Sequence, residues 1–239
     1  MKKISLLLSA GLLGAVPLLS MAEEEAVHQV TANVAMTTDY LFRGLSQTDE
    51  NPAIQGGIDY SYTPVGFYAG TWASNVAFAE SSEFDFYAGL SGELGIGVSW
   101  DVGGLYYTYP GSSADPEENY FEVYTNLGYS FSKVQLEPSL STGVFYSPDF
   151  FGEDGAGIYV YGGLDLSLPY DIGLSLLVGW QDVEGDMLTG PVGYDYTHYS
   201  IGLSRDVGPL SLSLSWNDAD DACGGDLCEA VVFTVSSSF

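Results

Sequence analysis

The chain ends in Glu229-Ala-Val-Val-Phe-Thr-Val-Ser-Ser-Ser-Phe239, and this stretch decides the fold class. Its apolar residues Val231, Phe233 and Val235 alternate mainly with Thr and Ser. Successive side chains of a β-strand point to opposite faces, so alternation of period two predicts a strand between an apolar and a polar medium. The last strand of a secreted β-sandwich would show the same pattern. The rest of the sequence must therefore decide between a sandwich and a membrane barrel.

The N-terminus has the features of a secretory signal peptide. Met1-Lys-Lys3 is basic, residues 4–19 are apolar, and Ser20-Met-Ala22 supplies small residues before a run of Glu. An apolar stretch this short, interrupted by Gly and Pro, does not anchor a chain in a bilayer. We expect residues 1–22 to be removed and residues 23–239 to form one domain.

The composition is strongly acidic but not that of a disordered chain. Removal of residues 1–22 takes two of the five basic residues and none of the 32 acidic ones, so the formal charge changes from −27 to −29. Such a chain repels nucleic acid and anionic ligands and attracts cations. With 46% hydrophobic and 14% aromatic residues, disorder is excluded. Adaptation to a high-salt habitat would explain the acidity equally well.

Stretches of about ten alternating residues fill the mature chain, as transmembrane strands do. The clearest is 209–217, where Leu210, Leu212 and Leu214 alternate with serines. The predicted strands are 28–38, 53–62, 66–75, 82–91, 96–109, 119–130, 134–146, 157–168, 171–181, 195–205, 209–217 and the terminal stretch.

The links between these stretches alternate strictly in length. Even-numbered strands are followed by tight links such as Thr63-Pro64-Val65, and odd-numbered strands by long polar loops such as 39–52. Up-and-down barrels have short periplasmic turns and long extracellular loops, whereas a Greek-key sandwich has no reason to alternate in this way. Closure also leaves no backbone group unpaired in lipid.

We therefore predict an all-β protein, a closed up-and-down antiparallel transmembrane β-barrel of about 12 strands in the bacterial outer membrane. A barrel of ten or fourteen strands and a soluble adhesin-like sandwich are the alternatives. A terminal strand that ends in an aromatic ring also resembles the signal that such barrels present to the barrel assembly machinery. Phe239 is the predicted assembly signal.

Several segments resemble the TorF-type porin family, a bacterial family also known as a conserved domain of unknown function. They are Thr38-Asp-Tyr-Leu-Phe-Arg-Gly-Leu-Ser-Gln47, Pro52-Ala-Ile-Gln-Gly-Gly57, Gly66-Phe-Tyr-Ala-Gly-Thr-Trp-Ala-Ser-Asn75, Glu83-Phe-Asp-Phe-Tyr87 and Tyr107-Thr-Tyr-Pro-Gly111, followed by Glu122. The resemblance implies an outer-membrane barrel with a pore function, and it supplies no substrate.

Acidic residues on the polar parity are predicted to line the lumen, because a charge on the lipid face costs several kcal/mol at mid-depth. These residues are Asp59, Glu83, Asp85, Glu122, Glu137 and Asp165. Carboxylates in a pore attract cations, which predicts passive diffusion of small cationic or neutral solutes. Alternatively, carboxylates and Tyr hydroxyls pair and fill a barrel that does not conduct.

Arg43 is the one basic residue in the motif-rich N-terminal half of the mature chain. We hypothesise that it folds into the lumen and pairs with Glu83 or Asp85, so that the first long loop forms a constriction. A solvated loop arginine is the alternative.

Catalysis and cofactors are not expected. Barrel hydrolases need a nucleophile and a base, and His28 and His198 are the only histidines. His198 lies near Asp195 and Ser200, but the spacing of Asp195 and His198 places their side chains on opposite strand faces. Gly103-Gly104 and similar pairs are expected to make room for bulky neighbours, since no helix follows as in a phosphate loop.

Cys223 and Cys228 are separated by four residues in an exported chain, which predicts a disulfide that closes a small surface loop. A metal site would need more ligands than this segment arranges. The other long loops are rich in Asp and Glu, and we expect outer-membrane lipid and lipopolysaccharide beside them, with divalent cations bridging weakly at the outer rim. A surface or adhesive role is the third functional class.

Overall fold

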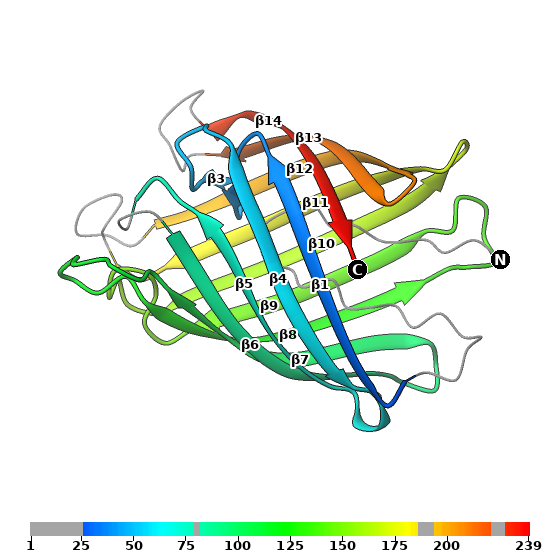
Figure 1. Cartoon of the computed structure of the whole chain (residues 1–239), viewed down its shortest axis with the longest axis horizontal. Helices are drawn as coiled ribbons and strands as arrows, with labels where there is room; N and C mark the ends of the chain where they lie inside the picture. Colours follow the sequence, from blue (N-terminus) through cyan, green and yellow to red (C-terminus); the bar gives the residue numbers. More distant parts are fainter. Residues whose placement is uncertain (1–25, 79–81, 186–193, 221–227) are drawn as a thin grey trace.

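The computed structural model describes residues 26–78, 82–185, 194–220 and 228–239. The predicted signal peptide lies outside these ranges and stays a prediction. Within the described residues, twelve strands close into one antiparallel barrel (Figure 1). They are β1 His28–Thr37, β4 Ala53–Tyr62, β5 Phe67–Asn75, β6 Ser82–Glu93, β7 Val98–Thr108, β8 Tyr120–Ser130, β9 Ser139–Ser147, β10 Gly157–Leu168, β11 Ile172–Val183, β12 Tyr194–Val207, β13 Leu210–Asp220 and β14 Ala230–Ser238.

The barrel closes between the first and last strands. β1 pairs along its whole length with β4 and, through its second half, with β14, from Asn33 opposite Ser238 to Thr37 opposite Thr234. The other strands pair with their neighbours in sequence, so the topology is the predicted up-and-down meander. Figure 1 shows β1 beside β14 on the near side of the barrel. The predicted fold class is confirmed, and no described helix is long and apolar enough to cross a membrane.

The structure differs from the prediction at the start of the strand expected over 134–146. β9 begins at Ser139, and residues 131–138 form a turn in which Leu136 and Glu137 have positive φ values of 67° and 44°. Pro138 lacks a backbone N–H and cannot donate to a strand ladder, so it fits the end of a turn better than a strand interior. Glu137 therefore lies exposed in this turn, and its predicted place in the lumen wall is wrong.

The outer face is that of a membrane protein. It exposes large apolar side chains on the parity predicted to contact lipid, among them Val123, Ile201 and Leu214. Aromatic side chains mark both ends of this apolar band: Tyr60, Phe67 and Tyr129 near the short turns, and Phe86, Tyr106 and Phe121 near the long loops. Outer-membrane barrels carry such an apolar band between two aromatic girdles, so the protein is a bacterial outer-membrane barrel.

Several tyrosine rings of the inner wall lie over a glycine of the neighbouring strand. A Cβ atom built on Gly70 would meet the Tyr87 ring at 2.6 Å, and one on Gly103 would meet the Tyr124 hydroxyl at 2.5 Å. The ring passes over the neighbouring strand and its hydroxyl reaches the strand beyond: Tyr87 on β6 donates to Asp59 on β4. The glycines thus make room for the rings, as expected for Gly103. Gly162 instead has nothing within 4 Å.

Candidate functional site

The first long loop folds back into the barrel. Within it, β2 (Leu41–Phe42) and β3 (Leu45–Ser46) form a two-stranded hairpin, which we call the inner hairpin. Its two turn residues, Arg43 and Gly44, have φ values of 49° and 88°, the signature of a type I′ turn. A Cβ on Gly44 would meet His198 Cβ at 2.8 Å, so the tip rests directly against β12.

Polar contacts hold the base of the inner hairpin. Asp39 Oδ1 accepts hydrogen bonds from Ser46 Oγ at 2.7 Å and Thr48 Oγ1 at 2.8 Å, and Gln47 N donates to Tyr40 O at 2.7 Å. Asx-type bonding of this kind fixes a loop where no regular ladder exists. The Tyr40 hydroxyl extends the anchoring to the barrel wall by donating to Glu83 Oε1 at 2.8 Å. Burial and then the nearby Glu83 raise the pKa of Tyr40, which remains a neutral donor.

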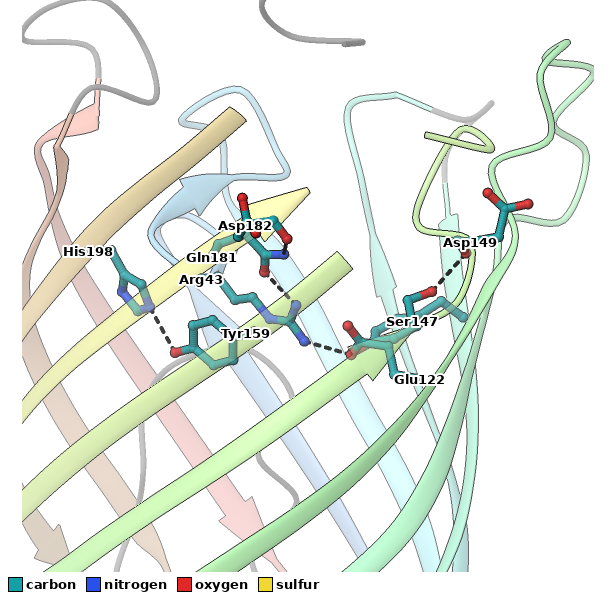
Figure 2. Close-up of polar contacts among 9 residues, drawn as sticks. Arg43, Glu122, Ser147, Asp149, Tyr159, Gln181, Asp182 and His198 are labelled. Carbon is teal, nitrogen blue, oxygen red and sulfur yellow. Dashed lines mark hydrogen bonds and ion pairs between the residues drawn. The ribbon is translucent and has the colours of Figure 1, made fainter. Parts of the chain in front are cut away.

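Arg43 extends from the hairpin tip to the wall formed by β8 to β11 (Figure 2). Its Nη2 donates to Glu122 Oε2 and its Nη1 to Gln181 Oε1, both at 2.6 Å. The arginine is 6% exposed and Glu122 is 1% exposed. Burial opposes the charge of Arg43, but the attraction of Glu122, the hydrogen bond to it and the nearby Tyr107 and Tyr120 together raise the pKa of Arg43 above its ordinary value.

The expected partners of Arg43, Glu83 and Asp85, are therefore not the ones that the structure shows. Both lie on β6, buried and facing the lumen, and Glu83 instead accepts from Tyr40. Neither Asp85 oxygen has a well-formed hydrogen bond among the described residues. Arg43 does not reach β6, because the hairpin tip contacts β12 and the arginine side chain points toward Glu122 on β8.

Aromatic rings surround the guanidinium of Arg43. Its Cζ lies 4.3 Å from the ring centre of Tyr159, 4.6 Å from Phe42, 5.3 Å from Phe145 and 5.9 Å from Phe150. A cation within about 6 Å of an aromatic face is attracted by the ring quadrupole, more strongly when water is excluded. We call Glu122, Gln181, Phe145, Phe150 and Tyr159 the guanidinium cage.

The remaining predicted lumen carboxylates lie further toward the short turns. Asp59 accepts the Tyr87 hydroxyl, and half-buried Asp165 shares the inward parity of β10 with Tyr159 and Tyr161. Asp101 was not among the predicted lumen residues, yet it faces the lumen and accepts a hydrogen bond from Tyr68 at 2.6 Å. Its facing was hard to predict because Gly103 and Gly104 interrupt the alternation of polar and apolar residues along its strand.

Gln181 and His198 were also missed as parts of this site. Gln181 lies on the inward parity of β11, at the end predicted for that strand, and its amide carries no charge that would mark it as a lumen group. His198 is 2% exposed, and its Nε2 lies 2.8 Å from the Tyr159 hydroxyl. Asp195 lies on the outer face, where its Oδ2 accepts from Trp180, so it does not contact His198. No group of three or more His, Cys, Asp or Glu in the described ranges is placed to hold a metal ion.

Two predicted residues lie at the margins of the described chain. Cys223 falls outside it, so the bond to Cys228 stays a prediction. Phe239 is 76% exposed, and its backbone exchanges two hydrogen bonds with Ala32 of β1. The terminal residue thus extends the pairing that closes the barrel.

Comparison with known proteins places the chain in a family. Residues 21–239 match the model of a family described as "Bacterial protein of unknown function (Gcw_chp)". The narrower TorF-type name stays a prediction. A search of curated proteins found no significant match.

The fold is similar to that of solved porins. A KdgM porin aligns with a TM-score of 0.56 and 9% identity over 87% of this chain and 98% of that one. A NanC porin gives 0.56 and 9% over 88% and 99%. A KdgM porin "in complex with disordered oligogalacturonate" gives 0.53 and 11% over 89% and 98%. At such identities the likeness concerns the fold alone.

Proposed function

The chain belongs to the bacterial Gcw_chp family, whose function is unknown, and from its lumen we propose that it is a porin-like channel for passive diffusion of small cationic or neutral solutes. The observation that carries the proposal is the charge of the lumen wall. Carboxylates face inward on several strands, and Arg43 is the one Lys or Arg directed inward among the described residues. Lys133 lies in an exposed turn and Arg205 on the outer face of β12.

The carboxylates are unevenly placed around the lumen. Asp59, Glu83, Asp85, Asp101 and Glu122 lie on β4 to β8, while β9 to β14 present mainly serine and glycine inward, with Asp165 on β10 as a further carboxylate. Arg43 neutralises Glu122 only. Rings or clusters of carboxylates raise the local concentration of cations and repel anions in a narrow pore.

The porin solved with oligogalacturonate binds a chain of uronic acids, each carrying a carboxylate. The same solute would meet repulsion in this lumen, because its carboxylates would face those of β4 to β8. The charge of the wall therefore supports a different class of solute on a similar barrel.

A non-conducting barrel with a structural or surface-interaction role is the second candidate, and the inner hairpin favours it. Tyr40, Arg43 and Thr48 are buried, so the hairpin fills part of the lumen below the long loops. A barrel in which this hairpin never moves would stabilise the envelope without passing solutes.

Planar bilayer recordings of refolded protein separate the two functions. We expect single-channel conductance and a reversal potential of cation-selective sign in a KCl gradient. The double variant Asp59→Asn/Asp165→Asn should lower that selectivity, and Arg43→Ala should raise both conductance and cation preference. No conductance in wild type or Arg43→Ala would contradict the channel, and anion selectivity would contradict the solute class.

The outer surface and the long loops of the barrel are the basis for proposing what surrounds it. We propose that the apolar band contacts outer-membrane lipid, that lipopolysaccharide surrounds the acidic loops, and that divalent cations bridge the two at the outer rim. Insertion would depend on the barrel assembly machinery, and Phe239 would be the signal that this machinery recognises. The family, fold and lumen give no reason to expect a cofactor or a nucleic-acid partner.

A further inference from the structure

The guanidinium cage is built by four barrel strands and one adjoining loop. Glu122, Phe145, Tyr159 and Gln181 come from β8, β9, β10 and β11, and Phe150 from the loop after β9. Only the guanidinium itself and Phe42 come from the inner hairpin. The wall thus forms a receptor, and Arg43 is the group that occupies it.

Each member of the cage also has a contact with the wall that does not involve Arg43. Tyr107 donates to Glu122 Oε2 at 3.0 Å, and Gln181 Nε2 donates to the backbone of Asp182 at 3.3 Å. The hydroxyl of Tyr159 contacts His198, as described above.

The two phenylalanines are supported in the same way. Phe145 stacks on Tyr124 with 5.0 Å between ring centres, and Phe150 packs on Tyr120 at 4.8 Å. A site whose groups are held by their own supports is preorganised and loses little entropy on binding. We therefore expect the cage to persist when the Arg43 side chain is absent.

The backbone of the inner hairpin gives no reason for an arginine at position 43. The residue has φ of 49°, a region that favours Gly, Asn or Asp, and Gly-Gly is a preferred pair for a type I′ turn. The arginine is therefore accounted for by its side chain, which fits the cage, and a glycine would preserve the turn.

From this geometry we propose that the guanidinium cage is a binding site for guanidinium-bearing solutes, and that Arg43 is a tethered ligand that such a solute displaces. This binding site would specify the solute class of the channel proposed above, and its physiological role depends on that channel function. Glu122 and Gln181 accept from two different nitrogens, and the ring centres of four aromatic side chains lie within 5.9 Å of Cζ. An alkylammonium offers neither the planar fork nor the flat face.

Displacement must compete with a side chain that is already in place. A tethered group acts at an effective concentration of about millimolar or more, so a free solute binds wild type weakly. The acidic lumen offsets part of this disadvantage by concentrating cations. Removal of the tethered side chain should reveal the full affinity of the cage.

Calorimetry on refolded Arg43→Gly tests the proposal. The probe is n-propylguanidinium, which has the atoms of the arginine side chain from Cβ outward, and its neutral isostere is n-propylurea. We expect one saturable site per barrel, with affinity at least tenfold above wild type. Glu122→Gln in the Arg43→Gly background should weaken binding about tenfold to a hundredfold, because it removes the negative charge that strengthens the hydrogen bond to the guanidinium. Lys133→Ala removes a cation far from the site and should bind as wild type does.

Heat-modifiable migration on denaturing gels confirms that each variant is folded. Folded Arg43→Gly without saturable binding overturns the proposal, as does equal binding of n-propylurea or an unchanged affinity in the Glu122→Gln double variant. If Arg43→Gly does not fold, Arg43→Ala is judged by the same criteria, and failure of both to fold contradicts the preorganised cage. Because calorimetry needs no conductance, binding by a non-conducting barrel would refute the channel alone, and conductance without binding would refute the cage alone.

Discussion

Replacement of Glu122 by Gln should destabilise the protein, because it leaves the Arg43 charge buried without its counter-ion. The two groups are 2.6 Å apart and almost fully buried. Removal of one partner of a buried ion pair costs about 3–5 kcal/mol. Glutamine keeps one oxygen that can accept from Arg43, so we expect the lower end, about 3 kcal/mol. With a urea m-value of about 1–3 kcal/mol/M, the unfolding midpoint should fall by roughly 1–3 M.

Tryptophan fluorescence during urea unfolding in lipid vesicles measures this loss. Trp72 packs against Tyr40 of the first loop, with ring centres 5.4 Å apart, so it reports release of the inner hairpin. Trp180 and Trp216 lie on the outer face and report unfolding of the barrel. Single-tryptophan versions should show the Trp72 transition moved most by Glu122→Gln.

A double-mutant cycle tests whether the loss belongs to the ion pair. Arg43→Met removes the charge and keeps an apolar stem among the rings, so the double variant should be more stable than Glu122→Gln alone. We expect a coupling energy of at least about 1.5 kcal/mol, within the range of contacting residues. Asp165→Asn, a lumen carboxylate away from Arg43, should change stability by no more than about 0.5 kcal/mol. A loss below about 0.5 kcal/mol for Glu122→Gln, with no coupling, would refute the reasoning.

Three further predictions concern the barrel as a whole. Gly70→Ala forces a Cβ into the tyrosine ring above it and should lower the unfolding free energy by about 1–3 kcal/mol, whereas Gly162→Ala, which meets nothing, should change it little. Phe239→Ala should reduce the heat-modifiable form in outer-membrane fractions while refolding in detergent stays unchanged; normal assembly would count against the signal. Alkylation of Cys223 and Cys228 should require prior reduction, as mass spectrometry would show, and labelling without reductant would contradict the disulfide.

The strands and their order could be predicted because each is decided by a local property. On β13, every second residue must suit lipid and every other one the lumen, so parity alone identifies the strand and its facing. Loop lengths then gave the topology, since a meander needs no long-range information. The alternation of side chains over 134–138 wrongly indicated a strand there. Pro138 has no backbone N–H to donate to a strand ladder, so the strand begins only after it.

The site was predicted only in part for a different reason. Parity placed Glu122 and Asp85 in the lumen, but it could not say which of them Arg43 would reach. That choice depends on where a long loop lands, and Arg43 is 79 residues from Glu122 and 138 from Gln181 in sequence. No periodicity connects residues so far apart. Their contact follows from the position along β12 that the hairpin tip contacts, which is His198.

The high tyrosine content of the sequence has a structural explanation in the barrel wall. A lumen-facing glycine leaves a gap that a ring on the next strand can cover, and the ring's hydroxyl then reaches a polar group on the strand beyond. Tyr161 on β10 lies over Gly143 of β9 and donates to Asn126 of β8 at 3.1 Å, as Tyr87 does for Asp59. Rings that lie along the wall satisfy carboxylates without crossing the lumen. Arg43 is different because it approaches from the inside, and for that reason it occupies a site on the wall that a solute could also reach.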